Sequence, residues 1–570
     1  MGHRPYFECD SFFRWATRRT ILDPEDLMLK NATAAAFFTF SLTMAWGQQA
    51  EIKTADCAKL ASLTLPGTKV VSSEVVAAGA FTPPGAAQPS ANGKALFAWT
   101  PAFCRVVLMD KPSADSAIPI EVWMPVKGWN GRFRGQGNGG FAGSTDYTGL
   151  ALAVTKGYAS AATDTGHEGS VGDASWALGH PEKVIDFGYR AIHEMTVKAK
   201  AVVEAYYAAP ATHTYFASCS DGGREALMEA QRFPEDYDGI IAGAPANNWT
   251  RLMATALYNT QALTLDPQDY IPSSKLPAIA AAVLAECDAA DGVKDGVIND
   301  PRSCHFKPAT MICKGAETDQ CLTAKQAHTL EVLYAGSHDA SGKKIFPGYL
   351  PGSEDGPGGW SLWITGPVPM GSAISGLAKG YFADMVYERA DWDLKTASIE
   401  DSLKAAVAKT GLALDATDPN LKPFVSRGGK LILYHGWNDP AISALNTIEY
   451  YEAVRAATGE KLADSSVRLY LVPGMQHCAG GPGATNFGQF WLPPGNSPDD
   501  AEHDVNLAME AWVEKGAAPQ QLITGKYADQ ANHFQLLMTR PLCAYPKGSH
   551  YKGTGDTNDA ANFTCVGAGK

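Results

Sequence analysis

The segment around Ser220 constrains the fold more than any other part of the chain. A short apolar run at 214–218 leads into this serine, and a helical pattern at 222–232 follows it. A strand, a sharp turn and a helix in that order present a serine hydroxyl at the edge of a sheet. Small residues on either side, Ser218 and Gly222, allow the chain to bend that sharply. The pattern predicts an α/β fold with Ser220 as a candidate nucleophile; the alternative is a serine in an ordinary turn.

Two more candidate catalytic residues follow predicted strands in the second half of the chain. Asp439 comes after an apolar run at 430–434, and His477 comes after another at 467–472. Serine, aspartate and histidine then occur in the chain order of the α/β-hydrolase triad. In such a triad the serine attacks an acyl carbon, the histidine transfers the proton, and the aspartate fixes the imidazole tautomer. We therefore predict Ser220, Asp439 and His477 as the catalytic residues; a capping aspartate and a structural histidine are the alternatives.

Two other histidines compete for the role of base. His435 lies four residues before Asp439, and His167 precedes the nucleophile in the chain. Neither position matches the chain order of the triad. We expect both to be hydrogen-bonded polar residues near the site.

Acyl transfer also needs two N–H donors for the oxyanion. The residue after the nucleophile, Asp221, is expected to supply one through its backbone amide. The other is expected from Gly140, which lies in an early glycine-rich turn. The alternative for this turn is a flexible loop without a catalytic role.

The order of the predicted elements indicates the domain organisation. Strands are predicted at 118–123, 158–163, 214–218, 240–244, 430–434 and 467–472, and helices at 185–207 and 222–232. The stretch from 246 to 424 differs because it is rich in turns, glycine and proline. We expect an α/β-hydrolase core in two parts, 48–245 and 425–570, with a large lid domain inserted at 246–424.

Residues 1–47 have the pattern of a removable leader. The apolar run at 34–46 is too short to span a bilayer, and Ala45-Trp46-Gly47 is an acceptable cleavage site. A signal peptide that starts at Met28 would place Lys30 just before that run; an N-terminal buried helix is the alternative. We expect a secreted or periplasmic protein. The net charge of −13 argues against nucleic acid and anionic membrane surfaces as partners.

The cysteines suit an oxidising compartment. There are eleven, and removal of the leader with Cys9 leaves ten, enough for five disulfides. Spacing suggests the pairs Cys57 with Cys104, Cys287 with Cys304, Cys313 with Cys321 and Cys543 with Cys565, which leaves Cys219 for Cys478. Spacing alone does not prove this connectivity. Zinc is the rival use of cysteine, but the chain has no CxxC pair.

An acidic segment between Cys287 and Cys304 is a candidate calcium loop. Calcium takes six to eight oxygen ligands from carboxylates and backbone carbonyls. The carboxylates would come from Asp288, Asp291 and Asp295, and the carbonyls from Val293 and Val297. The spacing differs from an EF-hand, and a solvated acidic turn is the alternative. A calcium ion here would stabilise the lid and take no part in the chemistry.

Long motifs resemble those of the tannase and feruloyl esterase family over about 57–565. They are WNGRF at 129–133, CSDGGRE at 219–225, QRFPEDYDGIIAGAP at 231–245, CDAADGVKDGV at 287–297, LILYHGWNDP at 431–440, LVPGMQHCAGGPG at 471–483, RPLCAYP at 540–546 and YKGTGDTNDAANFTC at 551–565. The resemblance implies an α/β-hydrolase core, a lid with calcium, and a disulfide between the cysteines beside the catalytic serine and histidine. It also implies the triad, oxyanion, calcium and disulfide residues named above.

The resemblance further implies a small aromatic ester as substrate. Trp363 resembles an aromatic wall of the acyl pocket, and Trp360 is close by. Where family members that act on terephthalate monoesters offer a lid arginine, residues 369–381 hold Lys379 and no arginine. We predict a secreted serine esterase that cleaves feruloyl, galloyl or related monoaryl esters through an acyl-enzyme. The alternatives are a serine peptidase or acyltransferase on the same scaffold, and a catalytically silent module that binds phenolics.

Overall fold

A nine-stranded sheet organises the chain. The computed structural model describes residues 56–84, 91–490, 492, 495–529 and 534–567, so the predicted leader and Cys9 lie outside the described residues. The strand order in the sheet is β1 (Thr68–Val76), β2 (Phe103–Asp110), β3 (Ile118–Pro125), β5 (Ala159–Thr163), β4 (Arg132–Gln136), β6 (His213–Cys219), β7 (Gly239–Gly243), β10 (Lys430–Gly436) and β11 (Val467–Val472).

The sheet has an antiparallel and a parallel part. The pairs β1–β2, β2–β3 and β3–β5 are antiparallel, and every pair from β5 through β4, β6, β7 and β10 to β11 is parallel. The predicted strands are all present, with ends within two residues of the expected ones. The six-strand prediction lacked β1, β2 and β4, three of the strands of this sheet. The candidate nucleophile therefore follows a central strand of the parallel part.

Helices cover both faces of the sheet. Together with the lid helices they are α1 (Ala91–Trp99), α2 (Tyr147–Thr155), α3 (Pro181–Ile185), α4 (Ala191–Tyr207), α5 (Asp221–Arg232), α6 (Trp249–Thr264), α7 (Leu276–Cys287), α8 (Ala324–Ala335), α9 (Trp360–Trp363), α10 (Ala373–Gly380), α11 (Ile399–Ala406), α12 (Leu412–Leu414), α13 (Lys422–Ser426), α14 (Ala444–Thr458), α15 (Glu460–Ser466) and α16 (Val505–Lys515). The helix predicted at 185–207 is α4 preceded by a π-helical turn, Asp186–Arg190.

Successive side chains of a strand point to opposite faces of the sheet, so neighbouring residues pack against different helices. Ile240 and Leu431 pack with α4, α5 and α14 on one face. Their neighbours Ile241 and Ile432 pack with α2 and α16 on the other. Both runs are continuously apolar because a parallel sheet with helices on both sides has no solvated face.

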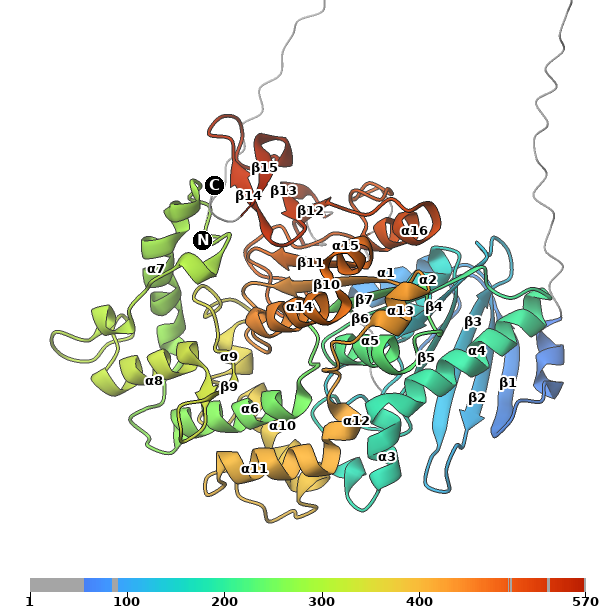
Figure 1. Ribbon diagram of the computed structural model, residues 1–570, viewed down its shortest axis with the longest axis horizontal. Helices are drawn as coiled ribbons and strands as arrows, with labels where there is room; N and C mark the ends of the chain where they lie inside the picture. The colour runs from blue at the N-terminus through green and yellow to red at the C-terminus, as the bar shows by residue number, and fades with distance from the viewer. Residues whose placement is uncertain (1–55, 85–90, 491, 493–494, 530–533, 568–570) are drawn as a thin grey trace, which may run out of the picture. The chain divides into compact units, whose positions relative to one another are not determined.

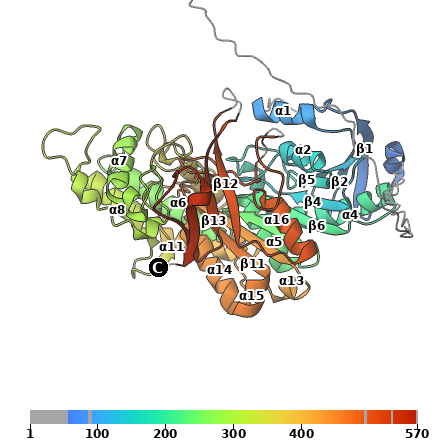
Figure 2. The same ribbon diagram turned by 90° about the horizontal axis from the view of Figure 1, so that it is seen from above.

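The stretch between β7 and β10 forms most of a second hydrophobic cluster. The chain leaves the sheet after β7 and returns at β10, its hydrogen-bonded neighbour. Helices α6, α7, α8 and α11 lie together to one side of the nine-stranded sheet in both views (Figures 1 and 2). Their cluster includes Leu257, Leu330 and Trp360, and also Phe141 and Phe187 from the first part of the chain. This insertion corresponds to the lid predicted at 246–424, whose boundaries stay a prediction.

Short two-stranded sheets complete the fold. They are β8 (Ser337–His338) with β9 (Lys344–Phe346), β12 (Gln521–Tyr527) with β13 (Leu536–Cys543), and β14 (Lys547–Tyr551) with β15 (Phe563–Gly567). Five disulfides are present, between the same partners that the sequence suggested. In the described part of the chain, no helix combines the length and apolar character needed to cross a bilayer.

Candidate active site

Ser220 occupies a strained turn between β6 and α5. Its φ of 68° and ψ of −122° lie in a region that non-glycine residues rarely adopt. The turn is held on both sides, because the Ser220 amide donates to the Gly243 carbonyl at 2.9 Å and the Ala246 amide donates to the Ser220 carbonyl at 3.1 Å. A Cβ atom at Gly222 would lie 1.9 Å from the Ser218 Oγ. The glycine is therefore required for the close approach that exposes the serine hydroxyl.

His477 joins Ser220 to Asp439. Its Nε2 lies 2.8 Å from the Ser220 Oγ, and its Nδ1 lies 2.8 Å from an Asp439 carboxylate oxygen. The two loops that carry His477 and Asp439 follow neighbouring strands, β11 and β10. They are also bonded to each other, since the Asn438 amide donates to the Met475 carbonyl at 3.0 Å. The three residues predicted from chain order are therefore brought into one hydrogen-bonded row.

Asp439 is an acid with many partners. Burial by itself would raise its pKa, but the His477 charge and hydrogen bonds from His435 and His477 hold the pKa of Asp439 well below its ordinary value. The amides of Ala441 and Ile442 also donate to this carboxylate, at 2.8 and 3.0 Å. The carboxylate is thus fixed in the orientation that faces the Nδ1 of His477.

His435 contacts the same carboxylate, a contact that sequence reasoning did not identify. Its Nε2 lies 3.1 Å from Asp439 and 2.9 Å from the Ile442 carbonyl, and its Nδ1 lies 2.8 Å from the Thr447 hydroxyl. The ring is fully buried. His435 is therefore a hydrogen-bonded polar residue beside the site, and it supports Asp439 directly.

His167 is also buried and hydrogen-bonded. Its Nε2 lies 2.7 Å from the Phe141 carbonyl, and its ring stacks on Trp176 with 3.7 Å between the ring centres. Burial lowers the pKa of His167 to about 4. The ring therefore belongs to the packing beneath the glycine-rich turn and does not line the central cavity.

A disulfide joins the residues next to the serine and the histidine. Cys219 and Cys478 are bonded, with 6.0 Å between their Cα atoms. Cys478 has a positive φ of 63°, as Ser220 does. Both cysteines line the cavity in front of the serine. The bond ties the end of β6 to the loop after β11 at the point where Ser220 and His477 meet.

The predicted oxyanion residues both border this cavity. Gly140 has a φ of 57°, and a Cβ atom there would lie 2.2 Å from the Val171 carbonyl. Asp221 is the first residue of α5, where backbone amides have no partner within the helix. The glycine-rich turn and the start of α5 are bonded to each other, because the Gly222 amide donates to the Asn138 carbonyl at 2.8 Å.

A buried network of charges supports the same two segments, and it was missed from the sequence. Arg224 binds the Asp221 carboxylate and the carbonyls of Gly188 and Phe187. Glu225 accepts a hydrogen bond from the Asn138 amide at 2.9 Å. Burial first, and then the charge of Asp221, raise the pKa of Glu225 to about 8. The motif CSDGGRE could have revealed this network, because it places Asp221, Arg224 and Glu225 in the first turns of α5. All three side chains are buried in the folded protein.

The site opens into a cavity of about 860 Å³ between the sheet and the lid. Trp363 lines it and meets His477 edge to face, with 5.0 Å between ring centres. Trp360 does not line it, although the sequence placed both tryptophans in the pocket. This ring is fully buried in the lid, packs near Tyr334 and Tyr349, and donates to the Ser353 hydroxyl at 2.9 Å. It belongs to the lid core.

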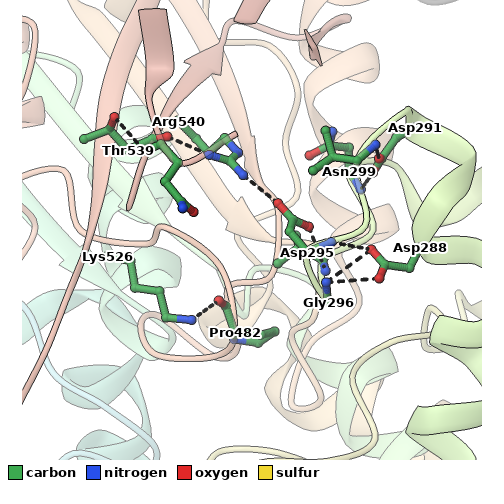
Figure 3. Close-up of polar contacts among 12 residues, drawn as sticks. Asp288, Asp291, Asp295, Gly296, Asn299, Pro482, Lys526, Thr539 and Arg540 are labelled. Carbon is green, nitrogen blue, oxygen red and sulfur yellow. Dashed lines mark hydrogen bonds and ion pairs between the residues drawn. The ribbon is translucent and has the colours of Figure 1, made fainter. Parts of the chain in front are cut away.

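The predicted calcium ligands lie within residues 288–297, and Figure 3 shows the three aspartates among them. Asp288 accepts hydrogen bonds from the amides of Asp295 and Gly296, and Asp291 accepts from those of Val293 and Asn299. Burial raises the pKa of Asp291 to about 6, and the charges of the other two aspartates add to this effect. Such a concentration of carboxylates suits a bound cation.

Two further observations bear on that loop. Within the described part of the chain, the carbonyls of Val293 and Val297 accept no hydrogen bond. Arg540 of β13 pairs with Asp295 at 2.6 Å and so attaches the loop to the second part of the core (Figure 3). Free carbonyl oxygens beside carboxylates fit the oxygen ligands that calcium prefers.

A second group of residues could hold a metal ion. His193, Glu229 and Asp236 each offer a ligand atom, and these atoms lie within 4.8 Å of one another. The His193 Nδ1 lies 2.7 Å from Asp236. Burial raises the pKa of Glu229 well above its ordinary value, so a protonated Glu229 that donates to Asp236 accounts for the same arrangement without a metal.

Comparisons with known proteins place this geometry in a family. A family model described as tannase and feruloyl esterase matches residues 104–566. An uncharacterized esterase of Xanthomonas campestris pv. campestris is 42% identical over 90% of this chain and 91% of its own length. Crystal structures of an esterase and of feruloyl esterase B, both from Aspergillus oryzae, superpose with TM-scores of 0.80 and 0.79. Their sequences are 30% and 28% identical to this chain, and each superposition covers 90% of this chain and 99% of the Aspergillus chain. The chain belongs to the tannase and feruloyl esterase family.

Proposed function

We propose that this protein hydrolyses carboxylic esters of aromatic acids through an acyl-enzyme on Ser220. The observation that carries the proposal is the continuous row from the Ser220 Oγ through the His477 imidazole to Asp439, with 2.8 Å at each contact. This row is what a serine hydrolase needs for proton transfer from the nucleophile. Its position at the rim of a large cavity gives an ester access to the serine.

The reaction follows from the positions of the atoms. The Ser220 Oγ attacks the ester carbonyl carbon while the His477 Nε2 takes the hydroxyl proton. The amides of Asp221 and Gly140 stabilise the oxyanion that forms. His477 then gives the proton to the leaving alcohol, and the acyl group remains on Ser220. Water attacks this acyl-enzyme in the same way, with His477 as base, and releases the acid.

The aromatic character of the acyl group is a proposal based on Trp363. Its ring lines the cavity next to His477, where it can stack on an aromatic acid. Relatives named as feruloyl esterases and the family description as tannase favour feruloyl and galloyl esters. Terephthalate monoesters are a weaker candidate, because Lys379 of the lid is exposed and lies outside the cavity lining.

Two structural features are proposed to support the active enzyme. Calcium bound by Asp288, Asp291, Asp295 and the carbonyls of Val293 and Val297 would stabilise the lid, which the crowded carboxylates and free carbonyls support. Export to an oxidising compartment is supported by the five disulfides. The leader at 1–47 remains part of this proposal.

Substitution of the nucleophile tests the function. Ser220→Ala is expected to lower the kcat for nitrophenyl acetate and for ethyl ferulate by about 10⁴-fold or more, because no acyl-enzyme can form. Ser465→Ala is the matched control: the hydroxyl of this exposed serine bonds the Leu462 carbonyl and the Ser466 hydroxyl, and the variant is expected to have wild-type kinetics. Equal hydrolysis by Ser220→Ala and the wild-type protein would show that the nucleophile is assigned wrongly. It would also revive the alternative of a phenolic-binding module.

A further inference from the structure

Arg134 is a buried cation without a direct partner. Arg134 lies on β4, only 6% of its surface is exposed, and it lines the same cavity as Ser220. Within the described part of the chain, its guanidinium makes no hydrogen bond and no ion pair, and its Nε is buried and unsatisfied. Burial lowers the pKa of Arg134, although the charges of Asp504, Asp146 and Glu510 act in the opposite direction. An unpaired buried guanidinium is costly, which indicates that it has a binding role.

The cavity continues past the serine toward this arginine. Side chains alternate between the two faces of a strand, so Arg134 and Gln136 of β4 point to the same face of the sheet. The strand register places Ala217, Ile241 and Tyr434 on that face as well. Helices α2 and α16 cover that face. We call the part of the cavity between them the Arg134 chamber; it is lined by Arg134, Gln136, Asp146, Thr148, Tyr434 and Asn506. It lies on the sheet side of Ser220, whereas Trp363 belongs to the lid.

The chamber offers hydrogen-bond acceptors as well as the arginine donors. A Cβ atom built at Gly149 would lie 2.3 Å from an Asp146 carboxylate oxygen and 2.9 Å from the Gln136 amide oxygen, so these two oxygens are close together. The other Asp146 oxygen accepts from the Gly149 amide, and the Gln136 NH₂ group donates to Ser160. The two oxygens near Gly149 therefore remain as acceptors.

This combination distinguishes between classes of ligand. A carboxylate would gain Arg134 but would face the Asp146 carboxyl group and the field of Asp504 and Glu510. A hydroxyl group both donates and accepts, so adjacent hydroxyls can bind Arg134 and the Asp146–Gln136 pair at once. An apolar group would leave all of these atoms unpaired. Hydroxyl groups are therefore the favoured ligand.

We propose that the Arg134 chamber binds the alcohol half of the ester and selects alcohols with adjacent hydroxyl groups, such as a sugar or another polyol. The inference rests on the proposed ester hydrolysis. An ester bound at Ser220 has one half on each side of the nucleophile, and the aromatic acid is assigned to the Trp363 side. The polar chamber then receives the alcohol.

A matched pair of substrates tests the proposal. Propyl ferulate and glyceryl ferulate differ by two hydroxyl groups on the alcohol. We expect wild-type kcat/KM to favour the glyceryl ester, and Arg134→Met to reduce the glyceryl-to-propyl ratio by about 10- to 100-fold, as loss of a charged hydrogen-bond donor implies. Arg389→Met is the control, because this exposed arginine pairs with Asp391 on the lid surface and should leave the ratio unchanged. An unchanged ratio in Arg134→Met would overturn the proposal and indicate that the chamber holds only water.

Two additions keep the result interpretable. If Arg134→Met does not fold, Asp146→Asn serves instead, since asparagine can still cap α2 while one of the two carboxyl oxygens is replaced by an NH₂ group; a reduced ratio supports the proposal and an unchanged one overturns it. Methyl caffeate and methyl 3,4-dimethoxycinnamate test the acid half. If Arg134→Met changes the ratio of kcat/KM for these two methyl esters and leaves the glyceryl-to-propyl ratio unchanged, the assignment of the chamber to the alcohol is wrong. Wild-type protein that fails to cleave even propyl ferulate would contradict the proposed function itself.

Discussion

Asp439 and Glu225 are buried carboxyl groups whose pKa values move in opposite directions because their neighbours differ. Asp439 is surrounded by two imidazoles and two backbone amides, all of which stabilise the anion. Glu225 has one backbone amide and lies next to the Asp221 carboxyl group, to which it donates when protonated. The Asp439 carboxylate is therefore stabilised as an anion behind the His477 ring. The Glu225 carboxyl group is stabilised in its protonated form, next to Asp221.

The raised pKa of Glu225 predicts a pH dependence of stability. Between the ordinary value of 4.5 and the folded value of about 8, the folded protein holds a proton that the unfolded chain has lost. Stability from this group is therefore full below about pH 4.5 and is lost as the pH rises to about 8. Glu225→Gln keeps the contact to Asn138 and cannot ionise, so its Tm should fall less between pH 5 and 8, by about 1–3 °C. Scanning calorimetry on both proteins measures this, and parallel Tm curves would contradict it.

At the scale of single elements, the disulfide between Cys219 and Cys478 is expected to control geometry more than folding. Cys219 is the last residue of β6 and pairs with Gly243, and Cys478 lies in the loop after β11, so the hydrogen bonds of the sheet should hold the strands after the disulfide is lost. A drift of about 1 Å between Ser220 and His477 would cost about 100-fold in rate. We expect the double variant Cys219→Ser, Cys478→Ser to lose about that much kcat while its circular dichroism spectrum is retained.

The lid bond between Cys313 and Cys321 provides the control for this prediction. It closes a loop with a sequence separation of 8 and does not border the cavity. The double variant Cys313→Ser, Cys321→Ser should therefore retain wild-type kcat. Wild-type kinetics in the Cys219 and Cys478 variant would show that the sheet alone positions the two catalytic side chains.

Elements with a clear period were predictable, and contacts between elements were not. The apolar runs gave β6, β7, β10 and β11 because parallel strands buried on both faces carry uninterrupted hydrophobic residues. The order of Ser220, Asp439 and His477 was readable because each follows such a strand. The four-residue helix Trp360–Trp363 has too few residues to reveal which tryptophan faces the cavity. Arg134 lies inside a strand, and nothing in its immediate sequence indicates a chamber on that face.

At the scale of the whole molecule, the lid and the core share buried contacts. Phe141 and Phe187 of the core pack in the lid cluster with Trp249. Gln476, next to the catalytic histidine, donates to the Asp355 carbonyl at 2.9 Å and accepts from the Gly358 amide at 3.1 Å. The described residues accordingly belong to one compact unit. A change in the lid should therefore be felt at the active site and in the stability of the core.

Removal of the proposed calcium tests this coupling. EDTA is expected to lower the Tm of the entire protein by several degrees, because an ion bound only by the folded state stabilises that state. The Asp295–Arg540 pair connects the loop to β13, so core and lid should melt in one shifted transition. Calorimetry with added calcium as control measures the shift. No shift would favour the solvated acidic turn, and a separate early transition would show that the lid unfolds independently.

The insertion of the lid between β7 and β10 has a consequence for protein engineering. These strands are paired in parallel, Gly239 with Lys430 and Gly243 with Tyr434, so the chain leaves at one end of the pair and returns at the other, roughly 13 Å along the strands, whatever the inserted segment contains. Doubling the length of an inserted segment costs about 0.6 kcal/mol in closure entropy. Chimeras that graft a relative's lid between residues 245 and 425 should therefore keep the nucleophile in place, provided that the new lid offers an apolar surface for Phe141 and Phe187.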